Sequence, residues 1–207
     1  MNGTAANSII LDIGMNIGGA ALYFLERHSN SIVYGFEPFK PTFERARKNL
    51  EQSGYYPHQR VQIFNYGFGG RDEEKEIVYN EKMSCGQSTD EKVNQRARDF
   101  YINNKIVTTA DDRIETIKVR QASRVIAEIR QRHPTENMVL KMDCEGAEYA
   151  IFEDLEAAGL LGGFKIIMLE WHYSGSEALE DALARAGYSY WSIPKSLDMG
   201  LIYACKG

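Results

Sequence analysis

Acidic and polar residues follow an apolar run near the start of the chain, and their spacing suits a ligand site. Residues 8–11 are almost wholly apolar, and Asp12, Gly14, Asn16 and Gly18 come after them. Such a run is typical of a strand buried on both faces, which ends at the ligand-binding edge of a parallel sheet. Glycines let the backbone approach a ligand, and the helix expected next offers unpaired N–H donors. The pattern predicts a nucleotide-type pocket.

This turn differs from the fingerprint of dinucleotide-binding proteins. That fingerprint, G-x-G-x-x-G, needs a middle glycine to admit a pyrophosphate, but Asn16 stands two residues after Gly14. The carboxylate of Asp12 would also repel a diphosphate. A ligand with an amine and a sulfonium fits better, and the structural alternative is a tight turn with no ligand.

A second acid stands where ribose recognition is expected. Residues 31–36 predict a second strand, and Glu37 and Pro38 follow it, about 20 residues after Gly18. In nucleotide-binding α/β folds an acid at this offset binds ribose hydroxyls. The acid therefore supports the first motif, although a single acid at a strand end is often only solvated.

Charged residues also gather where the fourth expected strand ends. Lys141, Asp143 and Glu145 alternate along residues 138–145, so that strand geometry puts them on one side. Burying charge without a partner is costly. The two readings are a functional cluster and a buried Lys141–Asp143 ion pair with a structural role.

The fifth expected strand, residues 163–172, ends with Glu170 and His172 on one face. An ordinary histidine pKa of about 6.5 would leave His172 mostly neutral at pH 7, which suits a general base. We therefore predict His172 as the base, with Asp143 as the second candidate and Lys141 beside it.

The alternation of strands and helices is interrupted between about residues 71 and 112. Residues 74–79 predict a hairpin strand, and the polar stretch that follows predicts a lid facing the substrate. Its polar and aromatic side chains would contact the acceptor; they are Asn80, Ser84, Gln87, Ser88, Phe100, Tyr101, Asn103 and Asn104.

Length and composition predict one α/β domain covering residues 1–207. The net charge of −5 argues against a nucleic-acid partner bound through a broad basic face. Three separated cysteines without C-x-x-C spacing indicate neither a disulfide framework nor a zinc site, and favour a cytoplasmic location. No signal peptide or membrane span is expected. The first strand begins within ten residues of the start, which suggests a module fused within, or cut from, a longer chain.

Taken in order, these motifs resemble the FkbM family of S-adenosylmethionine-dependent O-methyltransferases. The resemblance spans residues 8–172 and rests most specifically on K-x-D-x-E-G-A-E at 141–148. It implies a Rossmann-like class I methyltransferase fold, an α/β fold with a mostly parallel central sheet, an antiparallel C-terminal strand and helices on both faces. It also implies methylation of hydroxyl groups on sugars, glycans or polyketide-like metabolites. Two departures are Ala122-Ser123 in place of the usual Leu-Asp and the absence of the usual N-terminal covering segment.

The resemblance implies roles for the motif residues. The methionine part of the cofactor would lie on Asp12, Gly14, Asn16 and Gly18, its ribose on Glu37 and Pro38, and its adenine side on Asn65, Tyr66 and Gly67, with Asp143 also at the cofactor. The predicted substrate-binding residues are Glu145, Glu170, Phe100 and Tyr101. Dependence on Mg²⁺ or Mn²⁺ stays open, with Asp143, Glu170 and His172 as the candidate ligands and Lys141 arguing against a metal.

Overall fold

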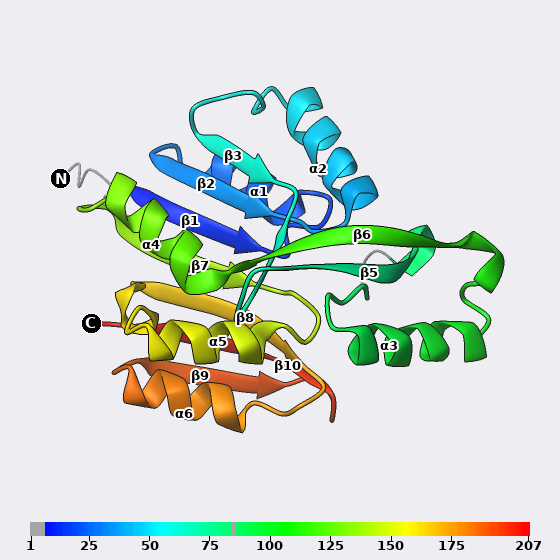
Figure 1. Cartoon of the computed structure of the whole chain (residues 1–207). Helices are drawn as coiled ribbons and strands as arrows, with labels where there is room; N and C mark the ends of the chain where they lie inside the picture. The colour runs from blue at the N-terminus through cyan, green and yellow to red at the C-terminus, as the bar shows by residue number, and fades with distance from the viewer. Residues whose placement is uncertain (1–6, 84–85) are drawn as a thin grey trace.

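The computed structural model describes residues 7–83 and 86–207, and it confirms the predicted α/β fold (Figure 1). The main sheet consists of β1 (Ser8–Ile13), β2 (Ser31–Phe36), β3 (Val61–Phe64), β7 (Asn137–Met142), β8 (Ile166–His172), β9 (Ser189–Pro194) and β10 (Met199–Cys205). Its strand order is β3-β2-β1-β7-β8-β10-β9. β1 is parallel to β2 and β7, whereas β10 is antiparallel to β8 and β9.

The apolar run in β1 is explained by helices on both faces of the sheet. α1 (Gly19–Arg27) and α2 (Lys40–Gln52) cover one face, and α4 (Ala122–Arg132), α5 (Glu148–Ala157) and α6 (Glu177–Arg185) cover the other (Figure 1). Ile9 and Leu11 pack with Ile151 of α5, whereas Ile10 packs with Leu25 of α1. Because successive strand residues face opposite sides, two cores need an unbroken apolar run. The same geometry brings the ends of β1, β2, β7 and β8 to one edge.

The interruption after β3 forms a small subdomain beyond that edge (Figure 1). β4 (Gly67–Gly69), β6 (Asp112–Gln121) and β5 (Glu73–Asn80) make a three-stranded sheet in this order. η1 (Glu81–Met83), α3 (Glu91–Asn103) and η2 (Thr109–Asp111) lie between β5 and β6. Within the stretch predicted as a lid, residues 91–103 form the helix α3, which the sequence analysis did not predict. Ser84 of the expected lid and Cys85 lie outside the described residues.

Tertiary contacts explain why the polar α3 is a helix. Asp90 caps it by accepting a hydrogen bond from the Val93 N–H at 3.0 Å. Arg98 pairs with Asp112 of β6, and Ala97 is buried against Met83. None of these contacts can be inferred from the spacing of apolar residues in α3 alone.

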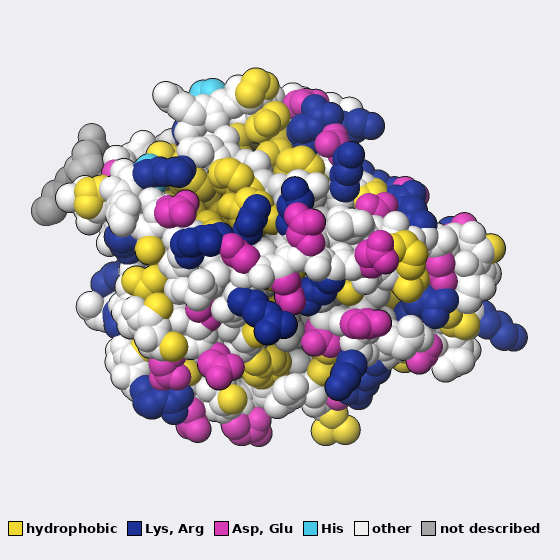
Figure 2. Space-filling view, viewed as in Figure 1, with side chains coloured by type: hydrophobic (Ala, Val, Ile, Leu, Met, Phe, Trp, Pro, Cys, Tyr) yellow, Lys and Arg dark blue, Asp and Glu magenta, His cyan; other side chains and the backbone are white. Residues whose placement is uncertain are grey.

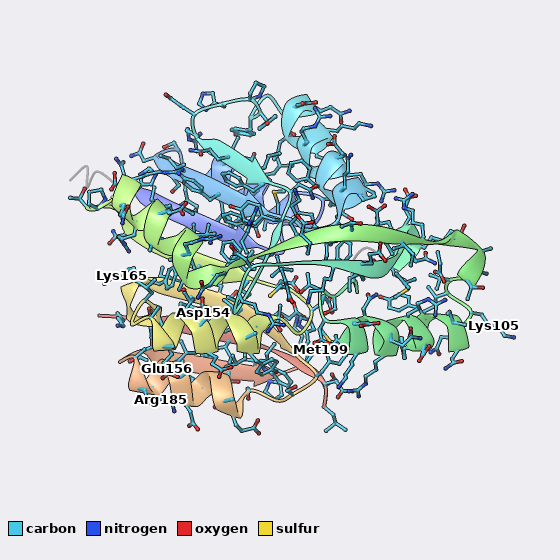
Figure 3. All side chains as sticks on the ribbon, viewed as in Figure 1. Lys105, Asp154, Glu156, Lys165, Arg185 and Met199 are labelled. Atoms are coloured by element: carbon cyan, nitrogen blue, oxygen red, sulfur yellow. The ribbon has the colours of Figure 1, made fainter. Side chains whose placement is uncertain are left out.

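Side-chain contacts also fix the helices that cover the front of the sheet (Figure 3). Asp154 of α5 accepts hydrogen bonds from the Ser123 N–H at 2.6 Å and from Gln121 at 2.7 Å, at the start of α4. Arg185 of α6 binds Glu156 of α5 through two N–H groups, at 2.7 and 3.0 Å. Ala122 and Ser123, the departure from the family pattern, are thus buried at a helix start.

Basic and acidic side chains are interspersed over the face made by α4, α5 and α6 (Figure 2). This face carries no broad basic surface of the kind that phosphate neutralisation requires. Within residues 7–83 and 86–207, no helix has the length and apolar character needed to cross a bilayer.

Candidate active site

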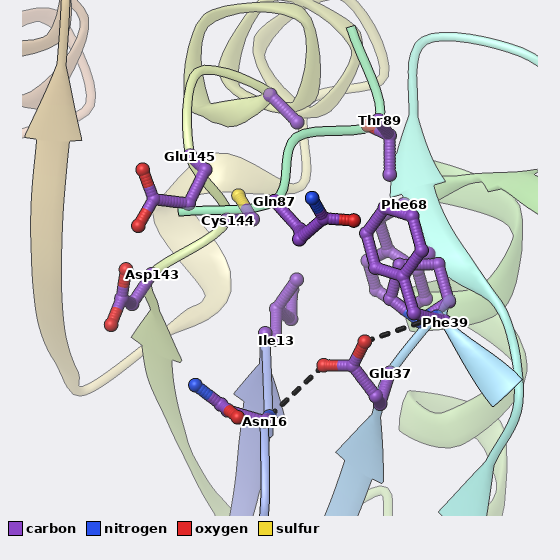
Figure 4. A pocket seen from close by; sticks show the side chains of 14 residues that line it. Ile13, Asn16, Glu37, Phe39, Phe68, Gln87, Thr89, Asp143, Cys144 and Glu145 are labelled. Atoms are coloured by element: carbon purple, nitrogen blue, oxygen red, sulfur yellow. Dashed lines mark hydrogen bonds between the residues drawn. The ribbon is translucent and has the colours of Figure 1, made fainter. Parts of the chain in front are cut away.

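A cavity, called here the motif cavity, opens where β1, β2 and β7 end (Figure 4). Predicted cofactor residues are part of its wall, namely Gly14, Asn16, Glu37, Pro38, Gly67 and Asp143, together with Glu145. The remaining lining residues are Ile13, Phe39, Phe68, Gln87, Thr89, Cys144 and Ala147. Asp12, Gly18, Asn65 and Tyr66, also predicted to bind the cofactor, do not line the cavity.

Glu37 is held in place by two backbone N–H groups. Its Oε2 accepts a hydrogen bond from Asn16 N and its Oε1 one from Phe39 N, each at 3.0 Å. Burial raises the pKa of Glu37 to about 7, although these hydrogen bonds oppose the change. A carboxylate has about four lone-pair sites. Each Glu37 oxygen therefore keeps acceptor capacity for a ligand hydroxyl.

The fully buried Asp12 forms an ion pair with the partly buried Lys141 near the ends of β1 and β7. Nζ of Lys141 lies 2.9 Å from Oδ1 of Asp12 and donates a hydrogen bond to the carbonyl of Gly14 at 2.9 Å. Burial lowers the pKa of Lys141, but the charges of Asp12 and Asp143 outweigh it and leave the pKa raised. Asp12 and Lys141 are direct neighbours across β1 and β7. The main partner of Lys141 is therefore Asp12, not the Asp143 of the structural alternative.

Gly14 allows the first motif to touch the end of β7. Its φ is +77°, and a Cβ at this position would lie 1.7 Å from the carbonyl oxygen of Asp143. L-amino acids with a side chain rarely adopt this φ, and the contact leaves them no space. Gly14 is thus required by the backbone approach between the two clusters.

Asn65, Tyr66 and Gly18 support the cavity from outside it. Nδ2 of Asn65 donates to the carbonyls of Glu37 and Pro38, at 2.9 and 3.0 Å. The Tyr66 ring packs among the aromatic rings at the end of β3. Gly18 has a φ of +87° and is the N-cap of α1. These residues position the loops around the motif cavity.

A second cavity of about 430 Å³, called here the aromatic cavity, lies on the other side of Glu145. Phe100 and Tyr101, which were predicted to contact the acceptor, line it together with Glu145 and His172. The other lining residues are Gly86, Arg96, Ala97, Tyr173, Ser196, Asp198 and Met199. Glu145 is the acid that borders both cavities, and its φ of +54° holds it in a left-handed conformation.

His172 is surrounded by three carboxylates. Its Nδ1 lies 3.0 Å from Glu148, and its Nε2 lies 3.7 Å from Glu145 and 4.0 Å from Asp143. Burial lowers the pKa of His172, but the hydrogen bond to Glu148 and the three acidic charges outweigh it and raise the pKa to about 9. The expectation that His172 is mostly neutral at pH 7 is therefore wrong.

The acids near His172 differ from the predicted metal set. Asp143, Glu145 and His172 each bring one ligand-type atom within 4.8 Å of the others. Glu170 is absent from this group, and its Oε1 lies 4.0 Å from Lys195. Glu170 lines neither the motif cavity nor the aromatic cavity.

The sequence analysis did not predict several of the residues that line the two cavities. It placed Gln87 at the acceptor, whereas Gln87 lines the motif cavity. Phe39 directly follows Pro38, Phe68 directly follows Gly67 and Tyr173 directly follows His172, so adjacency to predicted site residues could have indicated them. Arg96 and Thr89 gave no such signal, because only the tertiary position of α3 brings them to the site.

Comparison with known proteins identifies the family to which the chain belongs. Residues 12–190 match the model of the methyltransferase FkbM domain. The chain is 27% identical over 209 residues to the AMB antimetabolite synthetase AmbE of Pseudomonas aeruginosa, a match covering 88% of this chain and 10% of that protein. It is 29% identical over 154 residues to Methyltransferase 1 of Beauveria bassiana, covering 72% and 59% respectively. The chain thus spans less than two thirds of either relative.

Solved structures agree on the fold. The crystal structure of methyltransferase FkbM from Methylobacillus flagellatus superposes with a TM-score of 0.57 at 16% identity, covering 98% of this chain and 45% of that one. Precorrin-6y C5,15-methyltransferase from Geobacter metallireducens gives a TM-score of 0.51 at 10% identity, covering 99% and 83%. Such low identities show the fold alone. Because the family model matches most of the sequence, the chain belongs to the FkbM family of methyltransferases.

Proposed function

We propose that this chain transfers a methyl group from S-adenosylmethionine to a hydroxyl group of a sugar or glycan. Methyltransferases of this family generally use S-adenosylmethionine, which supplies an electrophilic methyl group on a sulfonium. The residues of the motif cavity fit this donor. Glu37 has acceptor capacity for the ribose hydroxyls, and Gln87 brings a buried, unpaired carboxamide.

The observation that carries the proposal is the position of Glu145 between the two cavities. A methyl donor and its acceptor must meet with the reacting atoms in line. The motif cavity encloses only about 90 Å³, less than the roughly 300–1,000 Å³ of ordinary ligand pockets. A donor bound at Glu37 must therefore extend toward Glu145, where the aromatic cavity begins.

Geometry favours Glu145 as the group that takes the acceptor's hydroxyl proton. Asp143 lines the motif cavity but not the aromatic cavity, and His172 lines the aromatic cavity but not the motif cavity. Glu145 lines both. Burial raises the pKa of Glu145 to about 7, although the charge of His172 opposes the change. A base with a pKa near the working pH is the most effective. His172 would then hold Glu145 in position, and Lys141 would support the Gly14 turn.

The aromatic cavity supports a sugar as the acceptor. Phe100, Tyr101 and Tyr173 offer ring faces that pack against the apolar side of a sugar, while Arg96 and Asp198 offer hydrogen bonds. Orienting a polyol requires such a mixture of surfaces.

A small hydroxylated metabolite is the second candidate acceptor. The similarity to AmbE, which is named as an antimetabolite synthetase, favours it. Because the match covers 10% of AmbE, we propose that this chain acts as a methylating module of a longer assembly. The described thiols Cys144 and Cys205 are free, which suits a reaction in the reducing cytoplasm.

We propose that the reaction needs no divalent metal. The imidazole of His172 already faces Asp143, Glu145 and Glu148 and can balance their charge. Turnover that survives exhaustive chelation supports this proposal. Turnover lost on chelation and restored by Mg²⁺ or Mn²⁺ would overturn it.

The function is tested by incubating the protein with S-adenosylmethionine carrying a deuterated methyl group and panels of sugars, glycans and small hydroxylated metabolites. Mass spectrometry should find one labelled methyl group on a sugar or glycan oxygen. Label found only on small metabolites would favour the second candidate. Label on nitrogen or carbon, or on none of the panels, would contradict O-methylation.

A further inference from the structure

The carboxamide of Gln87 is buried in the motif cavity without a partner among the described residues. The side chain is 8% exposed, and neither Nε2 nor Oε1 has a hydrogen-bond partner. In Figure 4 the carboxamide lies inside the cavity and is directed toward Phe68. An unpaired buried amide is costly to the folded state, so a ligand that satisfies it gains affinity.

The backbone on both sides of Gln87 is fixed by hydrogen bonds. Gly86 N donates to the carbonyl of Met83 at 2.8 Å. Ser88 N donates to Oδ1 of Asn94 at 3.3 Å, and Nδ2 of Asn94 donates to the carbonyl of Val78 at 2.8 Å. The chain thus directs Gln87 inward through contacts with η1, α3 and β5.

The other walls indicate which part of the donor faces this carboxamide. The ribose lies at Glu37, and the methyl end must reach Glu145 beside the aromatic cavity. The purine then occupies the opposite part, where Phe39, Phe68 and Thr89 form the wall (Figure 4). Rings in this wall can pack against a purine face, but they offer no hydrogen bonds to its edge.

We infer that Gln87 recognises the adenine edge of the methyl donor through its buried carboxamide. Oε1 accepts a hydrogen bond from the exocyclic amino group, and Nε2 donates one to an adjacent ring nitrogen. Glutamine pairs with adenine in this bidentate manner elsewhere. The inference rests on the proposed use of S-adenosylmethionine and adds a specificity residue to it.

Calorimetry on the unmodified protein gives the first test. S-adenosylhomocysteine is compared with its analogue whose purine lacks the 6-amino group. S-adenosylhomocysteine should bind about tenfold more tightly than the analogue, because one good hydrogen bond to a buried group contributes roughly that much affinity. Equal affinities would overturn the inference while leaving the proposed function intact. Failure to bind either ligand would instead count against the proposed function, and the inference would fall with it.

Substitution gives the second test. Gln87→Leu and the unbranched Gln87→Met should weaken S-adenosylhomocysteine about tenfold more than they weaken the analogue, because the analogue can lose only the bond to its ring nitrogen; the preference then disappears. Gln95→Leu is the matched control, because Gln95 is exposed on α3 and contacts Asp99. Without ligand, Gln87→Leu should also raise the Tm by about 2–4 °C, since an unpaired polar group is removed. A preference that persists in both folded variants would overturn the inference.

Discussion

Oε2 of Glu145 lies 3.7 Å from Nε2 of His172, at the boundary between the motif cavity and the aromatic cavity. The other nitrogen of the same imidazole lies 3.0 Å from Glu148, which is fully buried. Glu148 also accepts hydrogen bonds from the N–H groups of Cys144 and Gly146. The loop that carries Glu145 and the strand that carries His172 are therefore fixed to each other through one carboxylate.

Cofactor affinity should depend on pH through Glu37. Burial raises the pKa of this carboxyl from 4.5 to about 7, and the ionised form is the better acceptor for two ribose hydroxyls. Calorimetry should show S-adenosylhomocysteine binding weaken as the pH falls below about 7, approaching tenfold per pH unit. Glu37→Gln should bind weakly at every pH. A wild-type affinity that does not change between pH 5.5 and pH 8 would contradict this role of Glu37.

The same carboxyl should affect folding in the opposite direction. Between its unfolded pKa of 4.5 and its folded pKa of about 7, Glu37 binds more protons in the folded state. Its contribution to stability is therefore present at low pH and is lost as the pH rises through this window. Saturating cofactor should reduce this loss.

Lys141→Met should destabilise the fold, because it leaves the fully buried Asp12 without its cation. Removal of one partner of a buried pair costs roughly 3–5 kcal/mol. Urea unfolding measures this loss, with the exposed Lys165→Met as the control. If Lys141 were instead a catalytic group, the variant would unfold like the wild type and lose only turnover.

Gly14→Ala should disrupt the cavity, because its Cβ would lie 1.7 Å from the Asp143 carbonyl oxygen. The left-handed backbone alone costs about 1–3 kcal/mol in a residue with a side chain. Gly19→Ala is the control, because a Cβ there meets no atom within 4 Å. Gly14→Ala should lower both the Tm and the affinity for the cofactor, whereas Gly19→Ala should change neither. Equal behaviour of the two would refute the close approach.

Phe100→Ala with Tyr101→Ala should raise the acceptor KM while cofactor affinity stays within about twofold. Loss of a ring that packs against a ligand costs roughly 0.5–1.5 kcal/mol beyond its buried area. Steady-state kinetics with the methylated acceptor measure the change. Loss of cofactor binding would mean that these rings serve the motif cavity instead.

The strands and most helices could be predicted because their causes are local. The apolar runs of β1, β2, β7 and β8 follow from burial on both faces, and Gly14 and Glu37 lie at fixed offsets from them. Contacts between distant segments could not be predicted. Lys141 faces Asp12 only because β1 and β7 are neighbours, and the pKa of His172 is raised because Glu148 of α5 and the nearby Glu145 and Asp143 reach its imidazole.

Contacts between distant segments also explain why the helix α3 and the position of Gln87 could not be predicted. The polar composition of the predicted lid indicated no helix, but Arg98 gains a partner in Asp112 on β6 once β5 and β6 pair. Gln87 was expected at the acceptor because it lies in the polar stretch. It lines the motif cavity instead, since the fold turns residues 86–89 back across the end of β1.

In the proposed reaction, Glu145 takes the hydroxyl proton where donor and acceptor meet. The direct measurement is the turnover of Glu145→Gln at saturating cofactor, with Glu170→Gln as the control. We expect kcat to fall by about 10²–10⁴ while S-adenosylhomocysteine affinity is retained. The wild-type kcat should rise with pH through about 7, where Glu145 ionises. Unchanged turnover in Glu145→Gln, with its fold and cofactor affinity intact, would show that Glu145 does not take the proton.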